Sequence, residues 1–312
     1  MDTRPDFILL QRYLGLRTDT RSVSSKAAAT STTQTIDPSK PCPFPFLSDV
    51  IFISIDLEAF EHAHHIVTEV GVAIFDTRSA VDLAPGADAM HWIAQMDCRH
   101  LRLSEHAKLV NKRYVKGCPD KFDFGESEWI THKEAAPKLS EIFRCSAPSD
   151  GRAGHTTAAD SRSKVVKSAA RPPPRNIVLV GHGLKNDIDY LKSFRFSPYA
   201  AGNIIKTLDT QRLASSKSHT VGLKTLLVSL GVEPVHLHNA GNDAAYTLQA
   251  LILMALKAAS TPGGLSINIM SKVEARPKEQ PENKGGKALR RQRKLARRME
   301  MAAARGATNN DE

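Results

Sequence analysis

The stretch FISIDLEAFE, residues 52–61, joins a hydrophobic run to two carboxylates separated by one residue, Asp56 and Glu58. The run predicts a buried β-strand. Because side chains two positions apart in a strand point to the same face, the two acids face one place. A bland interpretation also exists, since strand ends meet solvent and Glu58 could cap a turn. The pair therefore indicates a functional site only if other parts of the sequence support it.

The surrounding segments predict an α/β domain over residues 46–260, with a mixed sheet flanked by helices. The first three strands follow one another with short links, which predicts an antiparallel meander, and the later apolar strands predict parallel pairing. The expected strands are 48–56, 66–77, 90–97, 176–182 and 203–209. The expected helices are 131–143, 184–194, 222–231 and 242–259.

Three segments lack the periodicity of a folded element. Residues 1–45 are expected to be mostly disordered, although the amphipathic piece FILLQRYLGL can form a helix on docking. Residues 145–175 are a basic, flexible insertion that ends in three prolines, and residues 261–312 are a basic tail, disordered or helical.

Positive charge is concentrated in the last two of these segments. Of a formal net charge of +10, residues 284–305 hold nine Lys or Arg and one Glu, and residues 144–175 hold seven and two Asp. The rest of the chain is slightly acidic. The tail predicts sequence-independent attraction to nucleic acid or a nuclear import signal, with a merely solubilising tail as the alternative.

The sequence indicates an intracellular protein of the nucleus, the cytoplasm or both. No apolar run reaches the roughly 18 residues of a membrane span, and no secretory signal is recognisable. The four cysteines form no C-x-x-C pair, so reduced thiols are expected rather than a zinc or redox site.

Two further acids follow expected strands or open expected helices. In GHGLKNDIDYL, Asp187 lies in the first turns of a helix that comes after a buried strand. In HLHNAGNDAAYTL, Asp243 opens a long apolar helix, five residues after His238. Either acid alone could simply favour a helix dipole. Together with Asp56 and Glu58 they form an ordered series.

This series resembles the DEDDh exonucleases, the 3′–5′ exonuclease branch of the RNase H-like superfamily. SIDLE matches the first motif, GHGLKNDIDYL the second and HNAGNDA the third, over residues 48–258. Flanking segments such as VTEVGVAIFDT and LQALIL are similar to a fungal RNase H-like group linked to mRNA export or RNA silencing. Gly183 and Asn186 depart from the usual second motif, which leaves substrate contacts there open.

The resemblance implies a metal-dependent 3′–5′ exonuclease acting on an RNA with a single-stranded 3′ end. Asp56, Glu58, Asp187 and Asp243 would bind two Mg²⁺ or Mn²⁺ ions, and His238 would be the general base. Hard divalent ions prefer carboxylate oxygens, and two of them about 3.5–4 Å apart stabilise phosphodiester hydrolysis. Without metal, the clustered acids would repel one another.

Other polar residues receive structural interpretations. His182 is expected to pack, His236 is a weaker rival for the general base, and Glu69 could brace the site. The remaining residues are expected to be exposed (His62, His64 and His65) or structural (Asp209).

Two other functions stay open. A catalytically silent adaptor would keep the fold and bind RNA or RNA-processing proteins through its tails, but it would not need the intact acid set. An endonuclease of the same superfamily fits less well, because His238 lies where the exonuclease pattern has it. No motif discriminates RNA from DNA or reveals the oligomeric state.

Overall fold

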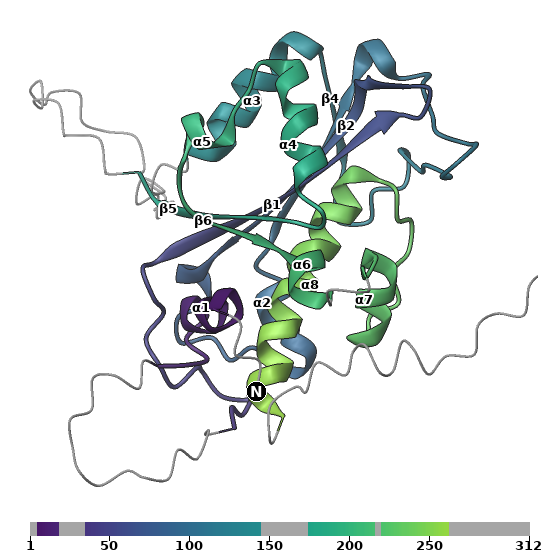
Figure 1. Ribbon diagram of the computed structural model, residues 1–312. Helices are drawn as coiled ribbons and strands as arrows, with labels where there is room; N and C mark the ends of the chain where they lie inside the picture. The colour runs from purple at the N-terminus through teal and green to yellow at the C-terminus, as the bar shows by residue number, and fades with distance from the viewer. Residues whose placement is uncertain (1–4, 19–34, 145–173, 216–219, 262–312) are drawn as a thin grey trace, which may run out of the picture. The chain divides into compact units, whose positions relative to one another are not determined.

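A six-stranded mixed sheet organises the residues that the computed structural model describes, which are 5–18, 35–144, 174–215 and 220–261. Its strand order is β4-β3-β2-β1-β5-β6 (Figure 1). The central meander β1-β2-β3 is antiparallel, whereas β5, β6 and β4 each run parallel to a neighbour. The strands are β1 (Val50–Phe60), β2 (Ala63–Asp76), β3 (Asp97–Leu103), β4 (Ser127–Ile130), β5 (Asn176–Gly181) and β6 (Asn203–Asp209). The expected α/β RNase H-like architecture is confirmed.

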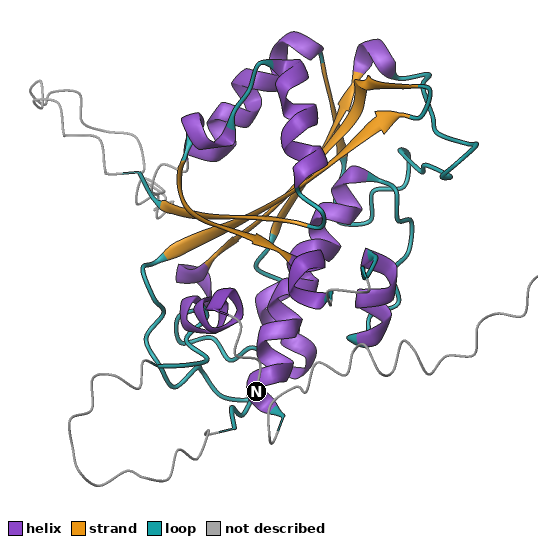
Figure 2. Ribbon diagram, in the orientation of Figure 1, coloured by secondary structure: helices purple, strands orange, loops and turns teal. Residues whose placement is uncertain are grey.

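Helices cover both faces of this sheet (Figure 2). On one face lie α3 (His132–Arg144) and α4 (Lys185–Leu191), and on the other α8 (Ala240–Ser260) packs against β1, β2 and β3. The other α-helices are α1 (Pro5–Tyr13), α2 (Met90–Ile93), α5 (Pro198–Ala201), α6 (Thr210–Ala214) and α7 (Leu223–Ser229). The 3₁₀ helices are η2 (Thr77–Ala80), η3 (Ala87–Ala89), η4 (Ser104–His106) and η5 (Lys192–Phe194).

Strand β1 divides the core into two halves by the alternation of its side chains. Ile51, Ile53 and Ile55 pack in one cluster with α3 and α4. Phe52 points to the opposite face, where its ring lies 6.2 Å from that of Tyr13 in α1 and 6.4 Å from that of Phe75. Because a buried side chain of this size stabilises the fold by about 1.5–3 kcal/mol, burial on both faces fixes β1 at the centre.

The expected strand at 90–97 is wrong. Residues 90–93 form the short helix α2, and the third strand is Asp97–Leu103. Trp92 is fully buried, and its indole N–H donates to the carbonyl of Leu83 at 2.9 Å. Its ring packs against that of Phe75, with the centroids 6.1 Å apart. A short apolar run has no periodicity that separates the two structures. The true strand was hidden because His100 and Arg102, although polar, are buried.

Part of the expected N-terminal disorder is also corrected. Residues 5–18 and 35–45 are described, and helix α1 buries Phe7, Leu10 and Tyr13. The backbone N–H of Leu47 donates to the carbonyl of Arg12, and that of Ile36 to Ala259 at the end of α8. The amphipathic pattern of α1 is satisfied within the domain itself. Residues 19–34 lie outside the described residues.

The expected basic insertion and tail fall almost wholly outside the described residues, which exclude 145–173 and 262–312. Arg175, at the end of the expected insertion, belongs to the fold. It is buried, and its guanidinium pairs with Asp49 at 2.9 Å and with Asp76 at 2.8 Å. These ion pairs connect the residue before β5 with the end of β2 and with the residue before β1.

Two findings bear on the expected cellular setting. Within the described ranges, no helix combines the length and the hydropathy needed to cross a membrane. Cys42, Cys98 and Cys118 are free thiols, and burial raises the pKa of Cys42 and Cys98 to about 12. Cys145 lies outside the described residues.

Candidate active site

Asp56 and Glu58 lie on the face of β1 that α8 covers. They continue the alternation of Phe52 and Ser54 and are paired across β2 with Gly71 and Glu69. The register of the β1–β2 pairing shifts directly after Glu58, so the regular ladder is interrupted next to this residue. The expectation that the D-x-E pair shares one side of the sheet agrees with this register.

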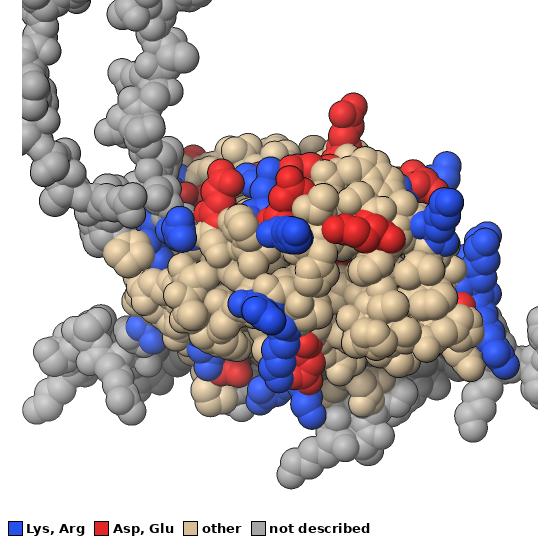
Figure 3. Space-filling model, turned by 90° about the horizontal axis from the view of Figure 1, so that it is seen from above, with Lys and Arg blue, Asp and Glu red and all other residues tan. Residues whose placement is uncertain are grey.

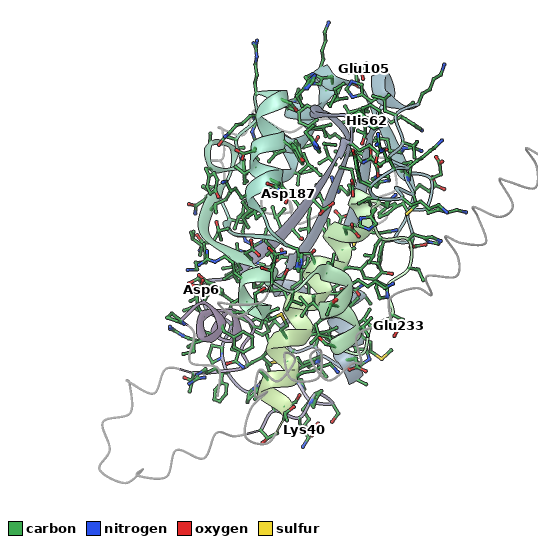
Figure 4. The ribbon with its side chains drawn as sticks, turned by 45° about the vertical axis from the view of Figure 1, so that its right-hand side comes forward. Asp6, Lys40, His62, Glu105, Asp187 and Glu233 are labelled. Carbon is green, nitrogen blue, oxygen red and sulfur yellow. The ribbon has the colours of Figure 1, made fainter. Side chains whose placement is uncertain are left out.

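A backbone hydrogen bond brings Asp187 to the same place. The N–H of Leu57, the residue between the two acids, donates to Asp187 Oδ1 at 2.9 Å. Pairing between β1 and β5 ends at Ser54, so this N–H lies beyond the ladder and is available to a side chain. Asp187 is buried in the first turn of α4, and Figure 4 shows it beside the strands.

The turn before α4 is shaped by Asp209. Its carboxylate accepts the N–H groups of Gly183 at 3.2 Å and Leu184 at 3.1 Å, and also caps α6. Gly183 has φ +80°, a conformation that favours glycine. This departure from the usual second motif is thus a backbone requirement of the turn, and Asp209 has the structural position that the sequence indicated.

Helix α8 supplies Asp243. Asn239 caps the helix by accepting the N–H of Asn242 at 3.1 Å, and the N–H of His238 donates to Asp243 Oδ2 at 2.9 Å. A close approach to β2 makes this placement possible, because a Cβ at Gly71 would lie 1.8 Å from the carbonyl oxygen of Ala240. Since Gly71 is paired with Asp56, the start of α8 is set directly over the D-x-E motif.

Three of the expected site residues come close enough to share one ion. One ligand atom each from Glu58, His238 and Asp243 lies within 4.8 Å of the others. Asp56 also belongs to the cluster, because Asp187, Asp243 and Glu58 all act on its charge.

The electrostatics of the cluster are unfavourable for anions. Burial, followed by the charges of Asp187, Asp243, Glu58 and Glu69, raises the pKa of Asp56 well above its usual range. Burial is also the largest cause that raises the pKa of Glu58 to about 8 and those of Asp187 and Asp243 to about 7. Among the described residues, no Lys or Arg forms an ion pair with these four carboxylates.

These residues fit divalent cations. Asp243 Oδ1 is buried and has no hydrogen-bond partner, an arrangement that is costly unless something else satisfies it. The donors are carboxylate oxygens with one imidazole nearby, and such oxygens suit Mg²⁺ or Mn²⁺. Positive charge at this position would turn the mutual repulsion of the acids into attraction.

His238 precedes α8 with a backbone φ of +66°, a left-handed conformation that a non-glycine residue adopts only when its surroundings enforce it. Its N–H bond to Asp243 and the bond from Cys118 N–H to its carbonyl supply that constraint. Desolvation lowers the pKa of its imidazole, which keeps the ring neutral near pH 7. A neutral ring can accept a proton.

Glu69 and His100 form a buried pair beneath the site. Glu69 Oε2 accepts the N–H of Ala240 at 3.3 Å and lies 2.9 Å from His100 Nε2, while His100 Nδ1 lies 2.8 Å from Ser127 Oγ. Glu69 therefore holds the start of α8, as the bracing interpretation expected. His100 was missed, because it lies in the strand whose position the sequence misplaced.

Other histidines that the sequence singled out have partners of their own or are exposed. His182 Nδ1 lies 2.9 Å from Thr210 Oγ1, and His236 Nδ1 lies 2.9 Å from Asp123 Oδ1, so His236 is engaged elsewhere. His62, His64 and His65 are exposed near the turn between β1 and β2.

Comparison with known proteins supplies a family. The family model described as DNA polymerase III subunit epsilon-like, C-terminal domain, of the DEDDh type, matches residues 51–254. These residues include all five expected catalytic positions.

Three fungal proteins are similar to the chain. An uncharacterized nucleolar protein of Schizosaccharomyces pombe is 28% identical over 210 residues, which cover 64% of this chain and 67% of that protein. An uncharacterized protein of Saccharomyces cerevisiae is 29% identical over 65% of this chain and 40% of its own length. The S. cerevisiae protein called Good for full DBP5 activity protein 2 is 25% identical over 64% and 34%. The match thus spans well under half of both budding-yeast proteins.

Proposed function

Because the chain belongs to the DEDDh exonuclease-like family, we propose that it is a metal-dependent 3′–5′ exonuclease that hydrolyses phosphodiester bonds of RNA. The observation that carries this proposal is a cluster of acids, Asp56, Glu58, Asp187 and Asp243, beside His238. Within the described residues, no Lys or Arg forms an ion pair with these acids. A structural role alone would not require four acids, of which Asp187 and Asp243 are buried and Asp56 and Glu58 half-buried, to face one another.

The chain's residues divide the work in this proposal. Asp56, Glu58, Asp187 and Asp243 hold two Mg²⁺ or Mn²⁺ ions. Such ions stabilise the charge that develops on the attacking and leaving oxygens of a phosphodiester. His238 accepts the proton of the attacking water, a role for which its lowered pKa keeps it in the basic form. The bonds from Leu57 and His238 N–H orient Asp187 and Asp243.

RNA as substrate, and RNA-processing proteins as partners, follow from the resemblance to the fungal group linked to mRNA export or RNA silencing. A nuclear location is supported by the name of the nucleolar relative. The domain boundaries belong to the same proposal: residues 46–260 carry the catalytic domain, and the basic segments at 145–175 and 261–312 add affinity for phosphate.

The decisive experiment follows single-stranded RNA labelled at its 3′ or 5′ end during incubation with the purified full chain and Mn²⁺ or Mg²⁺. A 3′ label should be released first as a mononucleotide, while a 5′ label should remain on progressively shorter strands. EDTA and Asp56→Ala should both abolish the reaction. Release that persists in Asp56→Ala would contradict the proposal. Cleavage of circular RNA would instead indicate an endonuclease.

Titration calorimetry with Mn²⁺ separates the enzyme from a silent adaptor. The wild-type chain should bind the ion and Asp243→Ala should lose that binding. A chain that binds no Mn²⁺ but still binds RNA would be the adaptor.

A further inference from the structure

A short exposed segment next to the carboxylate cluster carries positive charge and an aromatic ring. Residues 112–116 are all exposed, and the side chain of Tyr114 is 70% exposed. The segment includes Lys112, Arg113 and Lys116, and none of the three has an ion-pair partner among the described residues. What distinguishes Tyr114 from other exposed rings is this position beside three exposed cationic side chains.

The segment is held rigidly at its start. The amide of Asn111 donates to the carbonyl of Ala59 at 2.8 Å and accepts the N–H of Glu61 at 2.9 Å. The carboxylate of Glu61 accepts the backbone N–H groups of residues 112, 113 and 114 at 3.0–3.1 Å. These hydrogen bonds lower the pKa of Glu61 to about 2, so the contact persists at every physiological pH. Because Ala59 follows Glu58, this anchor lies beside a site residue.

The segment is held again just after its end. Cys118 N–H donates to the carbonyl of His238 at 3.2 Å, and its thiol donates to that of Leu237 at 2.9 Å. Asn239, the cap of α8, donates to the carbonyl of Cys118 at 3.2 Å. The segment therefore runs from the neighbour of Glu58 to His238. Since ligand atoms of Glu58 and His238 lie within 4.8 Å of each other, the segment borders the site.

Three rings line this border. The centroid of Tyr114 lies 6.4 Å from that of His62, and the centroid of His62 lies 5.3 Å from that of Phe60, both in edge-on arrangements. The guanidinium of Arg113 lies 5.3 Å from the Tyr114 centroid. Figure 4 shows His62 at the end of the β1–β2 hairpin, above Asp187. Seen from above, the molecule shows Lys and Arg side chains interspersed with acidic ones (Figure 3).

A largely exposed tyrosine ring beside exposed Lys and Arg side chains is the chemistry that binds single-stranded nucleic acid. Unpaired bases stack on aromatic side chains, and Lys and Arg follow the phosphates, without a requirement for sequence. In a duplex the base faces are already stacked and unavailable. An exposed ring in this position thus favours an unpaired strand over a paired one.

We propose that residues 112–116, together with His62, bind the single-stranded segment that leads into the carboxylate site. One base stacks on Tyr114, and the neighbouring phosphates contact Lys112, Arg113 and Lys116. This inference rests on the proposed nuclease function and assigns the residues that bind its single-stranded substrate.

The test measures binding of a six-nucleotide single strand in EDTA, where no hydrolysis occurs, by fluorescence anisotropy with the full chain. Tyr114→Ala should raise Kd about tenfold, the effect of losing one stacked base. Tyr114→Phe should retain affinity because it keeps the ring. Tyr199→Ala, which removes another exposed tyrosine from α5, should leave Kd unchanged. The basic tail is present in every variant and affects all of them alike.

A strand carrying 2-aminopurine reports stacking directly. Its fluorescence should fall on binding to the wild-type chain and to Tyr199→Ala, but not on binding to Tyr114→Ala. For charge, Lys112→Ala with Lys116→Ala should weaken binding and flatten its salt dependence, whereas Lys133→Ala on α3 should not.

The inference is overturned if Tyr114→Ala binds and quenches like the wild type, if the wild type does not bind the strand, or if a blunt duplex binds at least as tightly. Its failure is distinguishable from failure of the proposed function. A chain that binds through Tyr114 but releases no nucleotide with Mn²⁺ keeps this surface and loses the catalytic proposal. A chain that degrades RNA with KM unchanged in Tyr114→Ala keeps catalysis and loses this surface.

Discussion

At the scale of single residues, the carboxylate cluster opposes its own ionisation. Asp56, Glu58, Asp187 and Asp243 were foreseeable as a group because each occupies a recognisable motif at a strand end or helix start. Glu69 was foreseeable only as a neighbour, and His100 not at all. The pair they form depends on two strands coming into register, which no local pattern in the sequence encodes. The catalytic roles of the five residues stay predictions.

The role of Asp187 can be distinguished from that of other acidic residues in helix α4. Asp187→Asn should lower the rate of nucleotide release by about a hundredfold or more and weaken Mn²⁺ binding, because it removes charge where metal is proposed to bind. Asp189→Asn, two residues further along α4, removes an exposed acid that pairs with Lys192, and it should change neither. Rates and calorimetric titrations of both variants check this. Equal activity in the two would contradict the assignment.

The raised carboxylate pKa values predict a stability profile for the metal-free chain. An acid whose pKa is higher in the folded than in the unfolded chain stabilises the fold fully at pH values below its unfolded pKa, which is about 4. That stabilisation is lost as the pH rises through the pKa of the folded state. For Glu58, at about 8, and for Asp187 and Asp243, at about 7, the loss extends to pH 8.

In EDTA, the Tm should therefore fall by about 5 °C or more between pH 6 and pH 8.5, and Mn²⁺ should remove most of that fall. Asp243→Asn should show a smaller fall in EDTA, because one titrating acid is gone. Scanning fluorimetry across pH measures all three. A flat Tm in EDTA would contradict the electrostatic account of the site.

At the scale of elements, the contact between β2 and the start of α8 sets the geometry of the site. The expected helix at 242–259 and strand at 66–77 were close to α8 and β2, because long periodic patterns are dependable signals. The contact itself was not foreseeable, since it depends on the absence of a side chain at Gly71. The prediction of a strand at 90–97 was wrong because a short apolar run is compatible with either a helix or a strand.

Gly71→Ala should displace the first turn of α8. A Cβ there would meet the Ala240 carbonyl at 1.8 Å, which no rotamer can relieve, so we expect about 3 kcal/mol or more of destabilisation and loss of Mn²⁺ binding. Gly222→Ala, where a Cβ would have no neighbour within 4 Å, is the matched control and should change stability by less than about 1 kcal/mol. Urea denaturation measures both. Equal stabilities would mean that α8 does not lie against β2 at this point.

At the scale of the whole molecule, the fold extends beyond its recognisable motifs. The domain between β1 and α8 was predictable because alternation, apolar runs and motif order agree with one another. The N-terminal helix was foreseeable only as a piece that could fold on docking, because its amphipathic sequence is followed by a Ser/Thr/Ala-rich run. Only tertiary contact with Phe52 and α8 shows that its apolar face is used.

Leu10→Ala in α1 should therefore destabilise the entire domain by about 2–5 kcal/mol, since Leu10 is fully buried. Leu9→Ala, one residue earlier and only partly buried, should have a clearly smaller effect. Equilibrium unfolding of the two variants provides the measurement. If neither changed stability, α1 would contribute nothing to the fold.

The bond from Leu57 to Asp187 is made by the main chain. Any residue other than proline at the middle position of D-x-E has a backbone N–H that can donate to Asp187. That position is therefore free to vary among apolar side chains that fit the interior, and such substitutions would leave the hydrogen bond to Asp187 intact.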